Sequence, residues 1–247
     1  MKISKEEKVK VRRKLIMAAV KIIEKEGYKK ATMLKIAKAA GVGDSTIYKY
    51  FPSKDRFFFA YYELIAGEVV SSLETIEDFA EYSLQEKAQY LVEAILDRFD
   101  ENRKFVATGM DVMFNTPFSS INEIQPTKRL LSETLDGFIE TAIDQGEIPE
   151  LPLRDFLPSL FADYIQGIVL YWMKDSSENH TRTSQVIDRS SNLVVTIMQS
   201  GIIPKVMDLG MFFIRHHLVG WSSNFSNIIK SFEGLNSPLG RFHDVKR

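Results

Sequence analysis

The chain has 247 residues, of which 45% are hydrophobic and 26% are charged, so it is long enough to bury the core of one or two globular domains. It contains no cysteine, which excludes disulfides and thiolate metal sites and favours a reducing, cytoplasmic setting. The first residues are charged and lack the apolar segment of a secretory signal. The most apolar segment, 156–173, is interrupted by Pro158, Asp163 and Gln166, which favours a buried helix over a membrane span.

Positive charge is concentrated in the first sixty residues. They hold 16 Lys and Arg against 6 Asp and Glu, whereas the rest of the chain holds 16 against 27. A clustered cationic region attracts polyanions, because binding releases counterions from phosphates. A solvated lysine face has the same composition, so charge alone leaves both interpretations open.

Two helices are predicted at the start of this basic region. Apolar residues recur at helical spacing over 5–26, and Gly27 ends that helix because glycine tolerates positive φ. Thr32 is a natural N-cap for a second helix over 33–40, which Gly41 closes.

A third helix follows after only three residues, "GVG" at 41–43. It begins near Asp44, and Pro52 stops it because proline disfavours helical geometry in the residue before it. Two helices joined in this way form a helix-turn-helix, whose second helix lies in the major groove of DNA. Val42 fills the turn and Ile47 faces inward. The outward side chains are small or polar, as a reading helix requires: Asp44, Ser45, Thr46, Lys49 and Tyr50.

Three further side chains suit phosphate contacts around this motif. Tyr48 can pack its ring and aim its hydroxyl at a phosphate. Ser53 is expected to cap the fourth helix, where Lys54 and the helix dipole both favour a phosphate oxygen.

Residues 10–60 resemble the DNA-binding domain of the TetR family of bacterial transcriptional regulators. The matching stretch includes "TMLKIAKAAGV" and "IYKYFPSK" in the order the family uses them. The resemblance implies phosphate contacts from Thr32, Tyr48, Tyr50 and Lys54, and base contacts from Asp44, Ser45, Thr46 and Lys49. Lys35, on the outward face of 33–40, completes the expected DNA-binding set.

The sequence departs from the family pattern at two positions. Leu34 stands where many members carry a polar residue, so that contact is expected to be missing. Gly43 replaces the usual serine or alanine at the N-cap of the reading helix. Asp44 then either compensates as a capping acid or accepts a hydrogen bond from the N4 amino group of cytosine.

Beyond residue 60 the pattern predicts helices and no sustained alternation, hence an all-α fold. The expected helices are 55–77, 84–100, 103–115, 126–145, 154–174 and 184–200, with connections at 115–126, 145–153 and 176–184. We expect a helix-turn-helix domain at 1–54, a larger helical regulatory and dimerisation domain at 55–202, and a C-terminal extension at 203–247 with a loose tail. The extension either covers a pocket, extends a dimer interface or does neither.

Two apolar stripes are candidates for a dimer interface. They comprise Leu157, Leu160, Phe161, Tyr164, Ile168, Tyr171 and Trp172 in one helix, and Val186, Leu193, Val194, Ile197 and Met198 in another. In TetR-like proteins the last two long helices pair across a two-fold axis, which places two reading heads about one duplex turn apart, roughly 34–36 Å. The alternative is that both stripes face the monomer core.

Phenylalanine and methionine are frequent from 99 to 118, and with later aromatics they form a candidate pocket for a hydrophobic effector. The proposed lining residues are Met110, Met113, Phe114, Phe118, Phe138, Phe161, Tyr164 and Trp172. Ordinary core packing accounts for the same pattern.

Metal binding and catalysis find no support in the sequence. His216 and His217 are adjacent and so do not share a helix face, and no cofactor or metal is expected. The chain has no nucleophile elbow, phosphate loop or dinucleotide fingerprint, so we expect no enzyme.

We therefore expect a homodimeric repressor that binds double-stranded DNA and is released from a palindromic operator by a small effector of unknown identity. Activation remains open, since the same domain can recruit polymerase. The alternative class is a helical adaptor whose basic surface binds acidic partners or membrane.

Overall fold

The computed structural model describes residues 4–114, 121–151 and 154–213, and this part of the chain is helical without strands. The α-helices are α1 (Lys5–Glu26), α2 (Met33–Ala40), α3 (Asp44–Tyr50), α4 (Arg56–Leu73), α5 (Leu84–Asp100), α6 (Arg103–Phe114), α7 (Ile121–Asp144), α8 (Leu157–Lys174), α9 (Thr181–Gln199) and α10 (Ile202–Phe213). Short 3-10 turns lie at Phe79–Glu81, Arg154–Phe156 and Glu178–His180. The predicted all-α class is confirmed.

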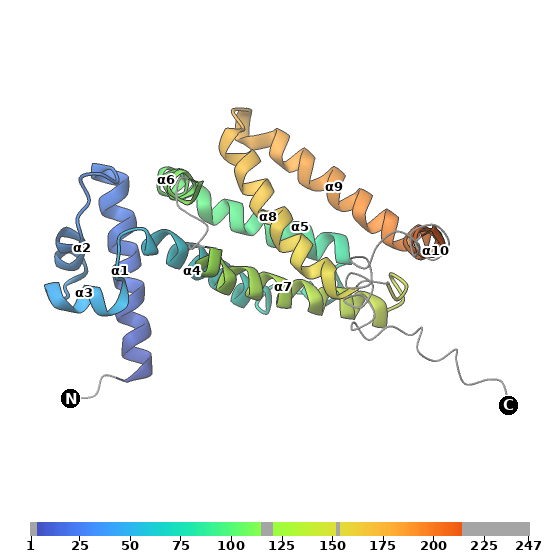
Figure 1. Ribbon diagram of the computed structural model, residues 1–247, viewed down its shortest axis with the longest axis horizontal. Helices are drawn as coiled ribbons and strands as arrows, with labels where there is room; N and C mark the ends of the chain where they lie inside the picture. Colours follow the sequence, from blue (N-terminus) through green and yellow to red (C-terminus); the bar gives the residue numbers. More distant parts are fainter. Residues whose placement is uncertain (1–3, 115–120, 152–153, 214–247) are drawn as a thin grey trace, which may run out of the picture. The chain divides into compact units, whose positions relative to one another are not determined.

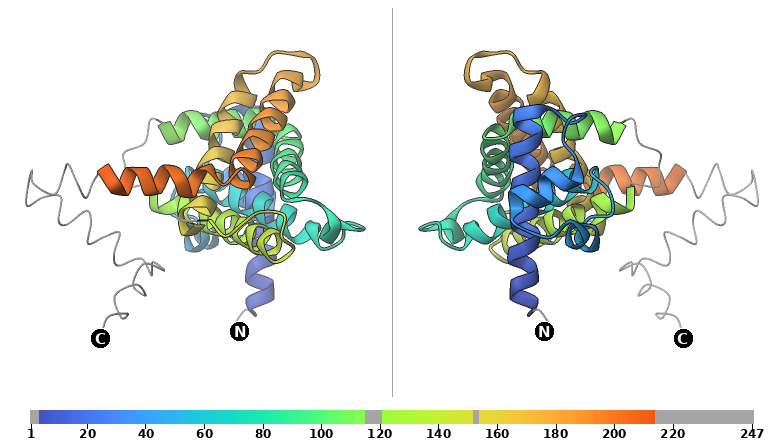
Figure 2. Two further views of the ribbon diagram at one scale, coloured as in Figure 1. Left: turned by 90° about the vertical axis from the view of Figure 1, so that its right-hand side faces the viewer. Right: turned by 90° about the vertical axis from the view of Figure 1, so that its left-hand side faces the viewer.

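The chain divides into two compact units, Met1–Gln199 and Ser200–Arg247, and the second contributes α10 to the described residues. Within the first unit, α1–α3 lie together at one end, and α4 runs from them among α5–α9 (Figure 1). Residues 4–10 are exposed, and the first turns of α1 extend beyond the helices that pack on its other half (Figure 2).

The helix ends of the N-terminal region follow the predicted signals. Thr32 caps α2, since its hydroxyl accepts from the N–H of Lys35 at 3.2 Å. Gly27 and Gly41 adopt φ of 83° and 68° at the ends of α1 and α2. The expectation for Ser53 is wrong: α4 begins at Arg56, because the chain after Pro52 makes a further turn before helical hydrogen bonding starts.

The predicted connection at 115–126 is also wrong in its second half. Helix α7 begins at Ile121 and contains Pro126. A proline this close to the start of a 24-residue helix removes a single intrahelical hydrogen bond. Packing of the following turns on α4 and α8 holds the helix in place.

A continuous hydrophobic core runs through α1–α9, and α4 is its central helix. It packs against α1, α5, α6 and α7. Phe58 of α4 connects the two ends of the unit: its ring centroid lies 5.6 Å from that of Tyr28 and 4.7 Å from that of Phe105 in α6. Helices α1–α3, called the reading head below, therefore share one core with the helices beyond them.

Helix α6 approaches α4 at Gly109, where neither helix has room for a larger residue. A Cβ on Gly109 would come within 2.7 Å of Cδ1 of Phe58 and closer still to the hydroxyl oxygen of Tyr62. That hydroxyl donates to the carbonyl of Val106 at 3.1 Å, so it is fixed in place. Glycine is required here by the short distance between the helices.

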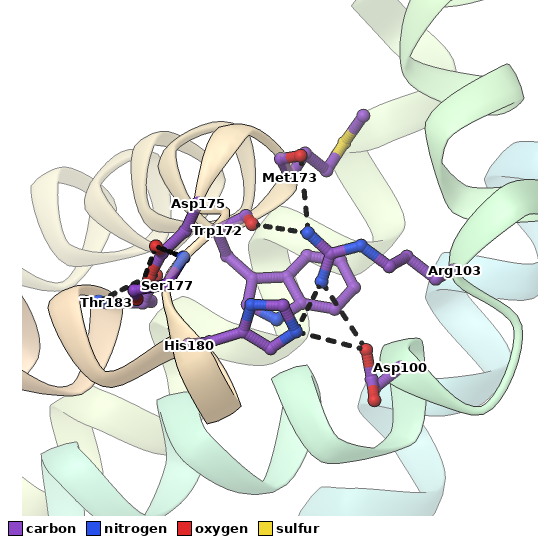
Figure 3. Close-up of polar contacts among 8 residues, drawn as sticks. All are labelled: Asp100, Arg103, Trp172, Met173, Asp175, Ser177, His180 and Thr183. Atoms are coloured by element: carbon purple, nitrogen blue, oxygen red, sulfur yellow. Dashed lines mark hydrogen bonds and ion pairs between the residues drawn. The ribbon is translucent and has the colours of Figure 1, made fainter.

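The start of α6 is tied to α8 by Arg103. Its guanidinium lies over the ring of Trp172 at 4.1 Å and donates to the carbonyls of Trp172 and Met173 at 2.8 and 3.3 Å (Figure 3). It also bonds Nε2 of His180 at 2.8 Å. Because arginine only donates, Nε2 is the acceptor in this contact, and Nδ1 is buried without a hydrogen-bond partner.

The next two residues of α6 bind α1. Lys104 donates to the carbonyl of Glu24 at 3.0 Å, and the backbone N–H of Phe105 donates to the Glu24 carboxylate. The first turn of α6 therefore connects the end of α8 to the end of α1.

The buried carboxylate of Asp175 organises the α8–α9 connection. It accepts from the N–H and hydroxyl of Ser177 at 2.9 and 2.6 Å, and from the N–H and hydroxyl of Thr183 at 2.9 and 2.7 Å (Figure 3). These hydrogen bonds, that of the Ser177 hydroxyl first, hold the pKa of Asp175 well below its usual value. Helix α9 consequently begins at Thr181, three residues earlier than predicted.

Replacing Gly109 with alanine is expected to destabilise the protein by about 1–3 kcal/mol, the usual cost of inserting a methyl group where none fits. Gly137→Ala is the matched control: this exposed glycine also lies inside a helix, and a Cβ there meets nothing within 4 Å. Alanine at that position should stabilise by about 0.5–1 kcal/mol. Urea unfolding measures both changes, and equal shifts would contradict the close approach of α6 to α4.

Candidate DNA-reading helix and ligand cavity

Helix α3 is held by one apolar anchor and presents the rest of its surface outward. Ile47 is fully buried, and α3 packs on α2 across the turn at residues 41–43. The N–H of Val42 donates to the carbonyl of Ala37 at 3.0 Å, which fixes the angle at which α3 leaves α2. Gly43 is the N-cap, as predicted, and makes no side-chain cap bond.

The predicted base-contacting residues lie on the accessible side of α3. Asp44, Ser45 and Lys49 are exposed, and Thr46 is half-buried. Tyr48 is 51% exposed, a large fraction for an aromatic ring on a packed helix, whereas Tyr50 is half-buried. This surface, defined by Asp44, Ser45, Thr46, Tyr48 and Lys49, is the reading surface.

Two of the predicted DNA-binding residues at the start of α2 already have intramolecular roles. Thr32 is exposed but uses its hydroxyl to cap the helix. The ammonium of Lys35 pairs with the carboxylate of Glu26 and donates to the carbonyl of Lys30 at 3.2 Å. The hydrogen bond from Lys35 lowers the pKa of the Glu26 carboxyl. Leu34 is 52% exposed beside them and offers no hydrogen bond.

Lys54 has a structural role that the sequence did not indicate. Its ammonium lies 3.9 Å from the ring centroid of Tyr28 and donates to the carbonyls of Tyr28 and Ala31. Partial burial lowers the pKa of Lys54. Two of its three N–H donors are used, which leaves one for a phosphate.

Tyr28 and Asp55 complete this cluster, and the sequence analysis missed both. The hydroxyl of Tyr28 donates to the carboxylate of Asp55, and burial together with that contact raises the pKa of Tyr28. The cluster ties the α1–α2 connection to the segment before α4, so it sets the position of α3 between them. The only local signal was an aromatic residue directly after Gly27.

Part of the positive charge of α1 is neutralised within the molecule. Arg12 pairs with Glu63 of α4 at 2.7 Å, and Arg13 pairs with Glu68 at 2.9 Å. These contacts orient the reading head on α4, and the exposed lysines of α1 supply the remaining positive surface.

A cavity of about 70 Å³ lies between α4, α5, α6, α7 and α8, with an almost wholly apolar wall. Its lining comprises Phe59, Tyr62, Ala66, Ile95, Phe99, Met110, Met113, Thr127, Lys128, Leu131, Ile165, Gln166 and Val169. Met110 and Met113 are among the residues predicted from the sequence. Phe99 of α5 also belongs to the segment 99–118 from which the pocket was predicted, whereas the contribution of α4 was not anticipated.

Four other predicted pocket residues line no part of this cavity. Phe138 packs against Phe79, with ring centroids 5.8 Å apart. Phe161 stacks on Tyr164, whose hydroxyl is hydrogen-bonded to Ser190 at 2.7 Å. Trp172 is buried beneath Arg103. Phe118 and the side chain of Phe114 lie outside the described residues.

The apolar stripes of α8 and α9 each divide between core and surface. Ile168, Trp172 and Met198 are buried. Other members point outward with large exposed fractions: Leu160 61%, Tyr171 42%, Leu193 59%, Val194 47% and Ile197 38%. The buried members of each stripe therefore belong to the monomer core, and the outward members form an exposed apolar surface on α8 and α9.

Within the described ranges, no group of three or more His, Asp or Glu side chains is arranged to hold a metal ion. The pair His216 and His217 lies outside them.

No single described helix is long and apolar enough to cross a membrane, although the bent pair Glu178–Gln199 and Ile202–Phe212 meets that test jointly by length and composition.

A helix-turn-helix with an exposed polar reading surface, joined to a helical body that encloses an apolar cavity, defines a one-component DNA-binding regulator. Comparison with known families agrees. Residues 15–61 match the family described as bacterial regulatory proteins, tetR family, and residues 87–213 match the tetracyclin repressor-like C-terminal domain. The chain belongs to the TetR family and is a DNA-binding transcriptional regulator.

Individual relatives extend the comparison. The chain is 29% identical over 195 residues to the fatty acid metabolism regulator protein of Bacillus subtilis, covering 76% of this chain and 93% of that protein. It is 31% identical over 106 residues to the nucleoid occlusion factor SlmA of Vibrio atlanticus, covering 42% of this chain and 54% of that protein. The second match spans about half of its relative, so the first is the more informative.

Solved structures share the fold. FadR from Bacillus subtilis in complex with stearoyl-CoA superposes with a TM-score of 0.55 at 23% identity, covering 76% of this chain and 98% of that one. FadR from Thermus thermophilus in complex with lauroyl-CoA superposes with a TM-score of 0.57 at 16% identity, covering 73% of this chain and 92% of that one.

Replacing Lys49 with alanine is expected to relax the preference for one base pair of the bound sequence by about 1–3 kcal/mol, because a base-edge contact is lost from the reading surface. Competition between single-substitution duplexes measures this change. Lys174→Ala removes the same charge from the end of α8 and should leave base preference unchanged. If Lys49→Ala weakened all duplexes equally, Lys49 would be a phosphate contact instead.

Proposed function

We propose that this regulator is a homodimeric repressor of fatty-acid metabolism that leaves a palindromic operator when an acyl-CoA enters the cavity. The observation that carries the proposal is an apolar cavity in a chain that matches a fatty acid metabolism regulator over 93% of that protein's length. The reading head would comprise residues 1–54, the regulatory part 55–202 and the extension 203–247. No catalytic role, metal or cofactor is part of the proposal.

The chemistry of the cavity supports an acyl chain. Its wall is built from aromatic, methionine and aliphatic side chains, which favour a hydrocarbon over a polar effector. At about 70 Å³ it has room for only a few water molecules. The acyl chain of the ligand therefore has to separate the surrounding helices.

That separation would reach the reading head through α4 and α6. Helix α4 contributes Phe59, Tyr62 and Ala66 to the cavity, and its first turn packs in the core shared with α1. Helix α6 contributes Met110 and Met113, and its first turn binds α1 through Glu24. An effector needs only to bind the widened arrangement better than the narrow one, with a coupling free energy of about 1–3 kcal/mol.

Dimerisation would use the outward apolar surface of α8 and α9. Its exposed members lie on the two helices that the family pairs across a two-fold axis, and Gly167 in α8 has no neighbour within 4 Å of a Cβ position. A self-complementary surface of this kind suits an isologous dimer. Activation instead of repression would show as operator binding that raises transcription.

Leu193→Arg is expected to give a monomer, because it places a charge in the centre of the proposed interface. Asn192→Arg adds the same charge to an exposed position about 100° round α9 and should leave the dimer intact. Sedimentation velocity distinguishes the two. If Leu193→Arg sedimented like the wild type, the interface would have to lie elsewhere.

Acyl-CoA binding is tested directly by calorimetric titration of decanoyl-CoA and of coenzyme A into the purified dimer. We expect saturable binding of the acyl thioester and at least tenfold weaker binding of coenzyme A, because the chain supplies the apolar burial. Ala66→Leu fills the cavity from α4 and should weaken decanoyl-CoA binding while the protein stays folded. Equal affinity for coenzyme A and its thioester would contradict an acyl-binding cavity.

A further inference from the structure

We propose that Lys128 of α7 selects the polar end of the effector: it binds an anionic head group at the α7–α8 edge of the cavity, in exchange for its present partner Asp163. This inference rests on the proposed acyl-binding function. It adds an orientation for the ligand and a residue that discriminates anionic from neutral head groups.

Apart from Tyr62, the polar members of the cavity lining lie on two of its helices. Thr127 and Lys128 lie on α7 and Gln166 on α8. The lining side chains of α4, α5 and α6 are apolar except for the hydroxyl of Tyr62. That hydroxyl already donates to the carbonyl of Val106. An amphipathic ligand is therefore expected to point its polar end towards α7 and α8.

Lys128 is suited to this position because its two halves have different surroundings. Its stem belongs to the apolar cavity wall, and its ammonium donates to both carboxylate oxygens of Asp163, at 2.7 and 2.8 Å. The Lys128 side chain is 25% exposed, whereas that of Asp163 is 54% exposed. The edge of the cavity thus opens to solvent at a charged pair.

The pair is a weak contact that an anionic ligand can replace. An ion pair between partly exposed side chains contributes little to stability, since water solvates both groups well. A ligand carboxylate or phosphate offers the ammonium the same oxygen chemistry, while its tail adds apolar burial that Asp163 lacks. A neutral head group makes no such exchange, so it leaves the Lys128–Asp163 pair intact.

The two partners should therefore have opposite effects on the same affinity. Removing the lysine charge removes the anchor for an anionic head. Removing the aspartate charge removes a competitor for that anchor and leaves the edge positive. A merely structural ion pair would not produce this sign reversal, because breaking it from either side would have the same effect.

The test is calorimetric titration of three ligands with the same ten-carbon chain, decanoyl-CoA, decanoate and 1-decanol, into the wild-type dimer, Lys128→Gln, Asp163→Asn and Lys174→Gln. Lys128→Gln should lose about tenfold in affinity for an anionic ligand and keep its affinity for 1-decanol. Asp163→Asn should gain severalfold for the same anion. Lys174→Gln, an exposed lysine of α8 outside the cavity lining, should match the wild type.

The ligands also separate the sources of the anion. If Lys128→Gln loses affinity only for decanoyl-CoA, the group that Lys128 binds is a coenzyme phosphate. If it loses affinity only for decanoate, that group is a carboxylate. Equal losses for 1-decanol and the anions in Lys128→Gln, or a loss in Asp163→Asn, would overturn the role of Lys128 and leave the acyl-binding cavity standing. Failure of the wild type to bind any of the three would overturn both proposals.

Discussion

The close packing of α6 on α4 at Gly109 is the constraint on which the rest of the first unit depends. Without a Cβ at that position, Phe58 and Tyr62 lie directly against the backbone of α6. Phe105 can then reach Phe58, and through it the core continues to Tyr28 in the reading head. The same two helices line the cavity, so the element that would sense a ligand and the element that carries the reading head are in direct contact.

Polar contacts at the start of α6 reinforce this arrangement. Arg103 connects α6 to the last carbonyls of α8, while Glu24 of α1 accepts from the backbone of Phe105. Helix α8 carries two of the five outward apolar residues, Leu160 and Tyr171, so the proposed dimer surface and the reading head are joined through one helical turn. Each contact is modest in free energy, but a regulator needs only a small difference between two arrangements.

Local signals in the sequence were sufficient to place α2 and α3, and tertiary contacts were not readable from them. Thr32, Gly41 and Pro52 mark helix ends by their own chemistry, so α2 and α3 could be placed. The contact of Lys54 with Tyr28 joins residues 26 positions apart, and no spacing rule indicates it. Helical spacing likewise identifies an apolar face without naming its partner, which is why Met110 lines the cavity while Trp172 supports Arg103.

The most direct measurement is selection of random duplex DNA by the purified protein, followed by binding of the enriched sequence at two salt concentrations. The account predicts a palindrome bound by two protomers or a multiple of two, with an affinity that falls steeply as salt rises. Salt-dependent retention of DNA without any enriched sequence would contradict it, because the basic region would then act as a charged surface and the polar face of α3 would read nothing.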